Sequence, residues 1–275
     1  MKMSQWARQL LLGESLKDKL ISTSNLEIDN NLIQLPESPG RNQQLQFSSK
    51  KMKFPKAVNL DQNEKKAMAL HAFANHELLA IEMMAASLLI YPHTNKDEIK
   101  LKQGIISAIK DEQKHLTLYI QRLNQLGFDF GDFPLNDFFW KQMPSLKTMP
   151  NYLAVMALTF ESANLDFSFF YENVFRQMGD IQTADIMKTV YQDEISHVAL
   201  GGHYLNKWRE DKSLWEYYRE CLPFPVTPDR AKGIYFYKES RLSAGLSQEF
   251  CYELERFKSH FKVTQRKQWN SSASL

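Results

Sequence analysis

The sequence predicts an all-α protein whose centre is a four-helix bundle with one long crossover. Three observations predict it. Apolar residues recur at helical spacing through four long segments, residues typical of helix starts and stops bound these segments, and only one connection between them is long. The four predicted helices cover about residues 61–91, 95–126, 148–178 and 180–211.

The first two helices are predicted to form a hairpin. Asp61 and Glu64 have the spacing of a capping box, and Pro92 ends the apolar run that follows them. Asn95 begins the second helix in a similar way, and Gly127 is a typical residue to follow its end. Because the connection is so short, we expect the two helices to be antiparallel neighbours.

The third and fourth helices are predicted to form a second hairpin. Thr148 and Pro150 mark the start of the third helix, and Gly179 separates its end from the fourth, which starts at Asp180. Segment 127–149 is long for a connection and rich in aromatic residues. It can carry the chain from one hairpin to the other, as the single crossover of some four-helix bundles does.

Two extensions flank the predicted bundle of residues 61–211. Residues 1–60 are expected to form a helix at about 4–20 and then an extended arm along the surface. Residues 212–275 contain a proline-rich loop, a predicted helix near 247–261 and a terminal NSSASL that we expect to be disordered. We expect this C-terminal extension to pack on the bundle.

Composition excludes several classes of protein. Of the 275 residues, 43% are hydrophobic, which is enough for a sizeable core. The formal charge of +2 gives no support for binding to nucleic acid or to a membrane surface. Acidic residues interrupt every long apolar run, so no membrane span is expected. Two cysteines and the lack of a secretory signal predict a cytoplasmic protein.

The chemistry is expected to come from a motif that occurs twice, D-E-x-x-H at 111–115 and again at 193–197. Glu and His three positions apart lie on the same face of a helix, so each motif can offer a carboxylate and an imidazole to one metal ion. Both motifs lie on the apolar stripe of their helix. A buried carboxylate is unfavourable unless it is paired or binds metal, so we expect both motifs to point inward.

The other two helices each carry one Glu on the apolar stripe, Glu77 and Glu161. Each of these, like the Glu of each motif, lies near the middle of its helix, so antiparallel packing places all four in one layer. The sequence therefore predicts a buried site with six ligands. They are Glu77, Glu112, His115, Glu161, Glu194 and His197.

Four acidic residues near these ligands are expected to have other roles. Glu82 and Asp166 each follow a predicted ligand by five positions and are alternative ligands, although their phase turns them toward a neighbouring helix or solvent. Asp111 and Asp193 precede the Glu of each motif and are expected to accept a hydrogen bond from a ligand His, which would fix its orientation.

Two tyrosines could also adjoin the site. Tyr119 follows His115 by one turn, and Tyr191 precedes Glu194 by about one turn. Either hydroxyl could bond to the site, or the two rings could simply pack in the core. Asn164 and Ser168, which are polar and face inward on the third helix, could mark a small wet pocket beside the metals or satisfy each other.

The pattern of a Glu followed by D-E-x-x-H in each half resembles the ferritin-like di-iron carboxylate superfamily. Segments 77–81 and 111–115 are similar to the first two ligand helices of bacterioferritin, and this resemblance covers about residues 61–210. With its arm, crossover and C-terminal region, the whole chain resembles a bacterial ferritin-like family of unknown function. The resemblance implies that the six predicted ligands bind two metal ions and that Glu112 and Glu194 bridge them.

The ligand set favours two iron ions, and a mixed manganese–iron pair is also compatible with it. Carboxylates with one imidazole per ion suit these metals, whereas zinc sites favour His and Cys, and both cysteines lie far from the motifs.

Such a site would suit an enzyme that activates O2 to oxidise or hydroxylate a small organic substrate, with electrons from a partner protein. The alternatives are a ferroxidase or iron-handling protein and a structural or interaction bundle stabilised by metal. A hydroxylase of modified transfer RNA is a special case of the first function that the charge does not support. The motifs specify neither the substrate nor the oligomeric state, and the aromatic crossover and terminal extensions are the expected places for a substrate pocket or lid.

Overall fold

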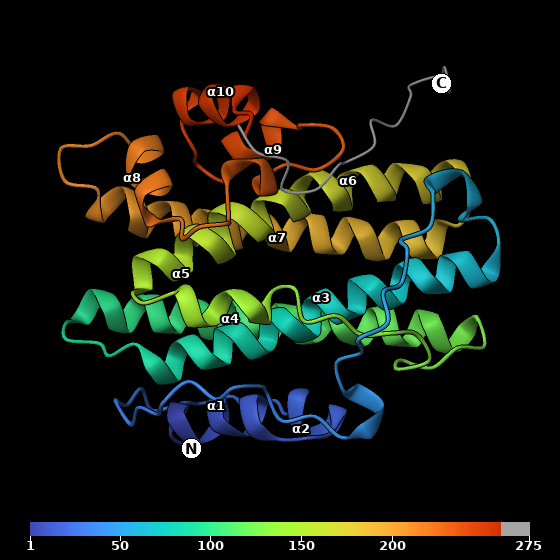
Figure 1. The fold of residues 1–275 in the computed structure, drawn as a ribbon, viewed down its shortest axis with the longest axis horizontal. Coiled ribbons are helices and arrows are strands. Elements are labelled where there is room, and N and C mark those ends of the chain that lie inside the picture. The colour runs from blue at the N-terminus through green and yellow to red at the C-terminus, as the bar shows by residue number, and fades with distance from the viewer. Residues whose placement is uncertain (260–275) are drawn as a thin grey trace.

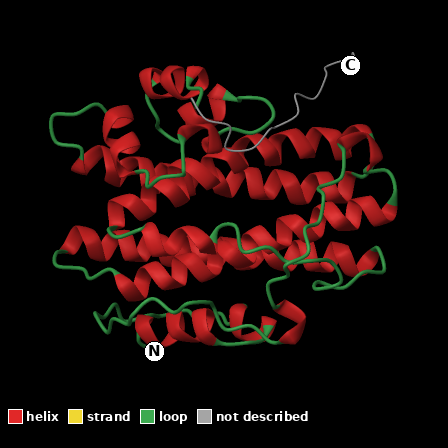
Figure 2. Ribbon diagram, in the orientation of Figure 1, coloured by secondary structure: helices red, strands yellow, loops and turns green. Residues whose placement is uncertain are grey.

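The computed structural model describes residues 1–259, and within this range every regular element is a helix (Figures 1 and 2). This confirms the predicted all-α class. The terminal NSSASL lies outside the described residues. Four long helical segments form the centre of the fold: α3 (Asn63–Ile90), α4 (Lys96–Gln125), the unbroken run of α5 (Met149–Val155), η4 (Met156–Glu161) and α6 (Ser162–Gln177), and α7 (Ile181–Trp208).

Side chains cap three of these segments where the sequence predicted. Asn95, Thr148 and Asp180 each accept a hydrogen bond from the backbone N–H three residues further on. The predicted start at Asp61 is wrong, because α3 begins at Asn63 without a side-chain cap. Its first residues, Asn63 and Glu64, are exposed, and burial begins at Lys66.

The shorter elements differ from the prediction in two places. The single helix expected at 4–20 is broken, because Gly13 ends the first helix and Ser15 caps a second one. The C-terminal extension contains two helices besides the one expected near 247–261. The helices of the extensions are α1 (Met3–Leu12), α2 (Leu16–Lys19), α8 (Leu214–Cys221), α9 (Lys238–Ser243) and α10 (Gln248–Arg256). The short 3₁₀ or irregular turns are η1 (Gln43–Leu45), η2 (Ala57–Asn59), η3 (Trp140–Ser145) and η5 (Pro228–Ala231).

Helix α3 is the most apolar segment of the chain. It is the one helix among residues 1–259 that is long and apolar enough to cross a membrane by length and composition alone. However, 89% of its most apolar window is buried inside the fold. Such burial is typical of the core helix of a soluble protein, and α3 indeed packs against both α4 and α1.

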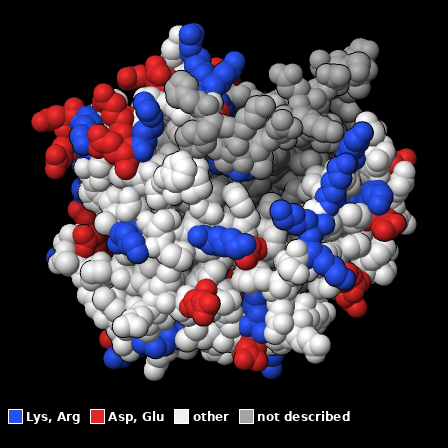
Figure 3. Space-filling view, in the orientation of Figure 1, with Lys and Arg blue, Asp and Glu red and all other residues white. Residues whose placement is uncertain are grey.

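The two extensions cover opposite sides of the bundle (Figure 1). The N-terminal helix α1 packs against α3, whereas α8 and α9 pack against the second hairpin and α10 packs against them. Figure 3 shows basic and acidic side chains interspersed over one face of the molecule, with large uncharged areas between them. The described part of this face therefore carries no continuous field of one sign.

A buried ion pair anchors each extension to the bundle. Glu82 of α3 contacts Lys19 at 3.1 Å and Arg41 at 2.6 Å. Asp166 of α6 contacts Arg241 at 2.7 Å and accepts two hydrogen bonds from backbone N–H groups of the C-terminal extension. Both carboxylates have no exposed area. The alternative assignment of Glu82 or Asp166 as a metal ligand is therefore corrected, because cations of the extensions already hold their oxygen atoms.

We predict that Arg241→Met destabilises the protein by about 3–5 kcal/mol, because it leaves Asp166 charged and unpaired in the core. The measurement is the free energy of unfolding in urea. Arg176→Met is the matched control, since Arg176 forms its ion pairs with Glu172 and Asp185 at the surface. Equal effects of the two substitutions would show that Asp166 does not need its partner.

Candidate metal centre

A π-helical turn and a close helix contact set the position of Glu161. In η4 the hydroxyl of Thr159 donates to a carbonyl five residues earlier, at 2.8 Å. Gly201 of α7 lies against this turn, and a Cβ atom there would come within 2.3 Å of the Ala157 side chain. Gly201 is one turn after His197 and Ala157 one turn before Glu161. The absence of a side chain at Gly201 therefore lets the two predicted ligands approach each other.

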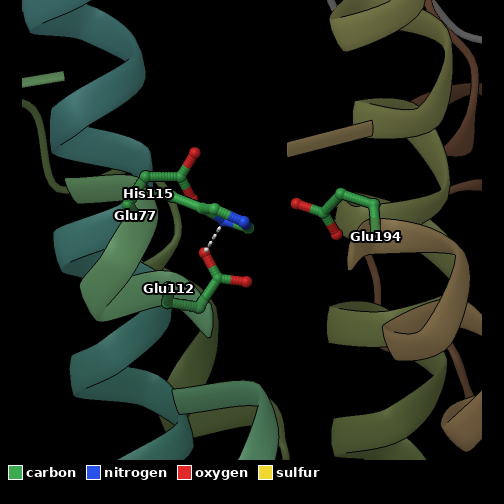
Figure 4. Close-up of side chains that lie close together, drawn as sticks. All are labelled: Glu77, Glu112, His115 and Glu194. Atoms are coloured by element: carbon green, nitrogen blue, oxygen red, sulfur yellow. Dashed lines mark ion pairs between the residues drawn. The ribbon is translucent and has the colours of Figure 1, made fainter. Parts of the chain in front are cut away.

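The six predicted ligands meet in the middle of the bundle, where each is at most 5% exposed. They form two overlapping groups whose potential ligand atoms lie within 4.8 Å of one another. Figure 4 shows one group, in which three side chains of the first hairpin face Glu194 of α7. Glu112 and Glu194 belong to both groups. The first group is Glu77, Glu112, His115 and Glu194, and the second is Glu112, Glu161, Glu194 and His197.

The Asp of each motif contacts the His of the other motif. The Nε2 atom of His115 lies 2.8 Å from Asp193, and Nε2 of His197 lies 3.4 Å from Asp111. Lys114 bridges the two carboxylates, at 3.3 Å from Asp111 and 2.5 Å from Asp193. The expected contacts between these Asp residues and the predicted ligand histidines are therefore present, and they connect α4 to α7.

These contacts leave the other ring nitrogen of each histidine, Nδ1, facing the cluster. It is buried without a hydrogen-bond partner in both His115 and His197. The same is true of both carboxylate oxygens of Glu112 and of one oxygen each of Glu161 and Glu194. A buried polar atom without a partner is unfavourable. One metal ion in each of the two groups would satisfy these atoms, so the residues present fit such ions.

The pKa values of most side chains in the cluster are raised. Burial raises the pKa of Glu77 and Glu161 well above the usual range, and the charge of Glu112 adds to the effect at Glu77. Glu112 is the exception, because its Glu and His neighbours outweigh burial and lower its pKa. Burial opposes the charged form of His115, but Asp193 and Glu112 raise the pKa of this side chain to about 9. The pKa of His197 is also raised, by Asp111 and the glutamates, against the effect of burial.

Of the two tyrosines predicted to adjoin the site, one lies near the cluster and the other does not. Tyr119 is buried and donates to the sulfur of Met187 at 3.4 Å, and burial and the nearby glutamates raise its pKa. Tyr191 lies elsewhere, because its hydroxyl is 3.0 Å from Ser240 in α9. The prediction that it adjoins the site is therefore wrong. Asn164 donates to Glu194 at 2.6 Å and so holds one of the two shared carboxylates.

A cavity of about 230 Å³ adjoins the cluster on the side away from Asp111 and Asp193. All four glutamates of the cluster line it, whereas neither histidine does. Its other walls come from α3, the crossover, the second hairpin and η5. Sequence reasoning gave both the crossover and the C-terminal extension as possible pocket walls, but it did not single out Arg230 of η5, since no periodic pattern marks so short a turn as facing the core.

The fold and the cluster define an all-α bundle protein with a buried carboxylate–histidine site that is compatible with metal binding. The chain belongs to the family described as "Protein of unknown function (DUF455)", which matches residues 3–252. It is also similar to a protein of Haemophilus influenzae described as uncharacterized, with 24% identity over 210 residues, or 71% of each chain. No solved structure gives a significant match.

We predict that Asp193→Asn lowers the affinity for Fe(II) or Zn(II) by about 10–100-fold, because His115 loses the charged partner that orients it. Anaerobic calorimetric titration measures the change. Asp185→Asn, an exposed substitution on the same helix, is the control and should bind metal like the unmodified protein. Equal affinities in the two variants would exclude an orienting role for Asp193.

A second prediction concerns protons. Glu77, Glu161, His115 and His197 have raised pKa values, so they retain protons to a higher pH than the free side chains do, and a bound cation must displace these protons. Metal binding should therefore release protons and become tighter as the pH rises toward about 9, the pKa of His115. Titrations in buffers with different enthalpies of ionisation count these protons. Binding without proton release would contradict the assignment of these ligands.

Proposed function

We propose that this protein binds two iron ions, or a manganese–iron pair, and uses them to activate O2 for oxidation or hydroxylation of a small organic substrate. One observation carries the proposal: ligand atoms of both motifs that make no hydrogen bond converge within 4.8 Å of one another, beside a cavity that reaches the carboxylates. The resemblance of the ligand pattern to ferritin-like di-iron carboxylate proteins supports it. Two free, buried cysteines fit the reducing conditions of the cytoplasm.

The donor atoms favour iron or manganese over zinc. Each of the two groups offers three carboxylates and one imidazole, a hard set dominated by oxygen. Glu77 and His115 would hold one ion, Glu161 and His197 the other, and Glu112 and Glu194 would be shared. When bound, such ions supply the redox chemistry with O2 that protein side chains lack.

The side chains of the protein would orient the ligands, limit access of water to the site and transfer protons. Asp111 and Asp193 fix the rings of the histidines, and Asn164 holds Glu194 through its amide. The aromatic and apolar residues of the walls would limit contact between water and the part of a substrate bound beside them. Glu77 and Glu161, whose pKa values are raised by burial, are suited to take up or release a proton at the floor of the cavity. Electrons would come from a partner protein.

We predict that anaerobic loading gives two Fe(II) ions per chain and that mixing with oxygen then consumes O2 and changes the visible spectrum. Glu112→Gln and Glu194→Gln should lose both ions, because each removes a ligand that the two groups share. Glu172→Gln, whose side chain pairs with Arg176 on the outside of α6, is the control.

Other outcomes distinguish the alternatives. A large shell that accumulates many irons per chain would replace the proposal with iron storage or ferroxidase activity. A folded protein that takes up no metal, or holds only an inert zinc ion, would leave a structural or interaction role.

A further inference from the structure

The cavity beside the cluster has aromatic walls. Four phenylalanines, one histidine and one methionine surround it above the carboxylate floor. They come from segments far apart in the chain: α3, the crossover, η4 and α6. The aromatic and sulfur-containing lining residues are His76, Phe138, Phe139, Met156, Phe160 and Phe167.

Three of these rings form a continuous stack. His76 of α3 stacks on Phe139 of the crossover, with centroids 5.0 Å apart and planes 18° apart. Phe139 in turn stacks on Phe160 of η4 at 4.2 Å and 6°. The stack joins three separate segments, and His76 and Phe160 cover the two faces of Phe139. The wall that it forms therefore offers mainly ring edges, which pack well against the face of an aromatic ring. Such a wall suits a flat ligand ring better than a flexible chain.

Among the lining residues within 1–259, Arg230 is the one Lys or Arg. The guanidinium of Arg230 lies over the ring of Phe138 at 5.1 Å, and Phe138 is 38% exposed. Arg230 is itself partly exposed, whereas the four glutamates are at most 5% exposed, so its positive charge lies nearer to solvent than the carboxylates do. A guanidinium has several N–H donors in a planar fork, so it can bind a carboxylate while it keeps its other contacts.

The volume limits the size of the ligand. An apolar cavity of about 150 Å³ is enough for benzene. At about 230 Å³, this cavity has room for one or two fused rings with a small substituent. It is smaller than the pockets of roughly 300–1,000 Å³ that hold drug-sized molecules.

We propose that the cavity binds a small aromatic carboxylate, with its ring against the wall formed by His76, Phe139 and Phe160 and its acid group at Arg230. This inference rests on the proposed function and names the substrate class of the same site. The bound molecule presents the ring edge opposite its carboxylate to the glutamate floor. That edge is the part of the substrate placed for oxidation.

Binding of three probes tests the proposal on the full-length protein as purified. The probes are 2-naphthoate, its neutral counterpart 2-naphthamide, and cyclohexanecarboxylate, which keeps the acid but lacks the aromatic ring. Calorimetry or the fluorescence of the naphthyl group measures each Kd. We expect 2-naphthoate to bind about tenfold or more tightly than either of the other two, the ratio that one charge-assisted hydrogen bond or one ring contact gives.

Matched substitutions separate the two contacts. Arg230→Gln should abolish the preference for 2-naphthoate over 2-naphthamide, whereas Arg219→Gln should leave it unchanged, since Arg219 lies over Trp215 of α8 and does not line the cavity. Phe139→Leu should reduce the preference for the aromatic ring, and Phe170→Leu, on the outer part of α6, is its control. Ratios between probes cancel any general loss of folded protein.

The binding experiment and the test of the proposed function can fail separately, because probe binding is measured without O2 consumption. The expected selectivity in a protein that neither loads iron nor consumes O2 would support the binding site and refute the proposed function. A protein that loads iron and consumes O2 but shows no preference for 2-naphthoate, or retains the preference after Arg230→Gln, would overturn the inference alone. Tighter binding of cyclohexanecarboxylate would overturn it in favour of an aliphatic acid.

Discussion

The burial of six ionisable side chains in one layer is the constraint on which the rest of this structure depends. Four carboxylates and two imidazoles lie within the core and are at most 5% exposed. Such groups are strongly unfavourable in an apolar medium unless each is neutralised, paired or bound to an ion. Three features of the fold reduce this cost. Some of the carboxyl groups have raised pKa values and so retain protons more readily, and both histidines contact an Asp on the outward side of the cluster. Long helices hold the six side chains in place.

The two halves of the bundle repeat the same arrangement. In each hairpin one helix carries a cluster glutamate and, five positions later, a buried acid, Glu82 or Asp166, while the other helix carries D-E-x-x-H. The buried acid of each half binds the extension that covers it. The repeat explains why the extensions lie on opposite sides. The contacts of His115 with Asp193 and of His197 with Asp111 connect the two halves, because each runs from the motif of one hairpin to the motif of the other.

The parts of this structure that follow a helical period were predictable from sequence, and the others were not. The convergence of Glu77 and Glu161 with the two motifs followed from the position of each on an apolar stripe. The exchange of Asp partners between motifs depends on the distance between α4 and α7, which no single helix encodes. The prediction that Tyr191 adjoins the site was wrong because the stripe of α7 also faces α9, a helix that the sequence did not predict. Arg230 belongs to an irregular segment, where side-chain direction follows from tertiary contacts alone.

The cluster has two different sides, and this asymmetry favours the proposed reactive site over a purely structural one. On the α4–α7 side, Asp111, Asp193 and Lys114 occupy the outward atoms of the histidines. On the opposite side, the four glutamates face a cavity instead of packed side chains. A site that only stabilised the bundle would gain from filling that space, because voids in a core are unfavourable. The space beside the carboxylates stays open, while Asp111 and Asp193 occupy the outward nitrogen atoms of the histidines, so the cavity that reaches all four glutamates is the one with aromatic walls.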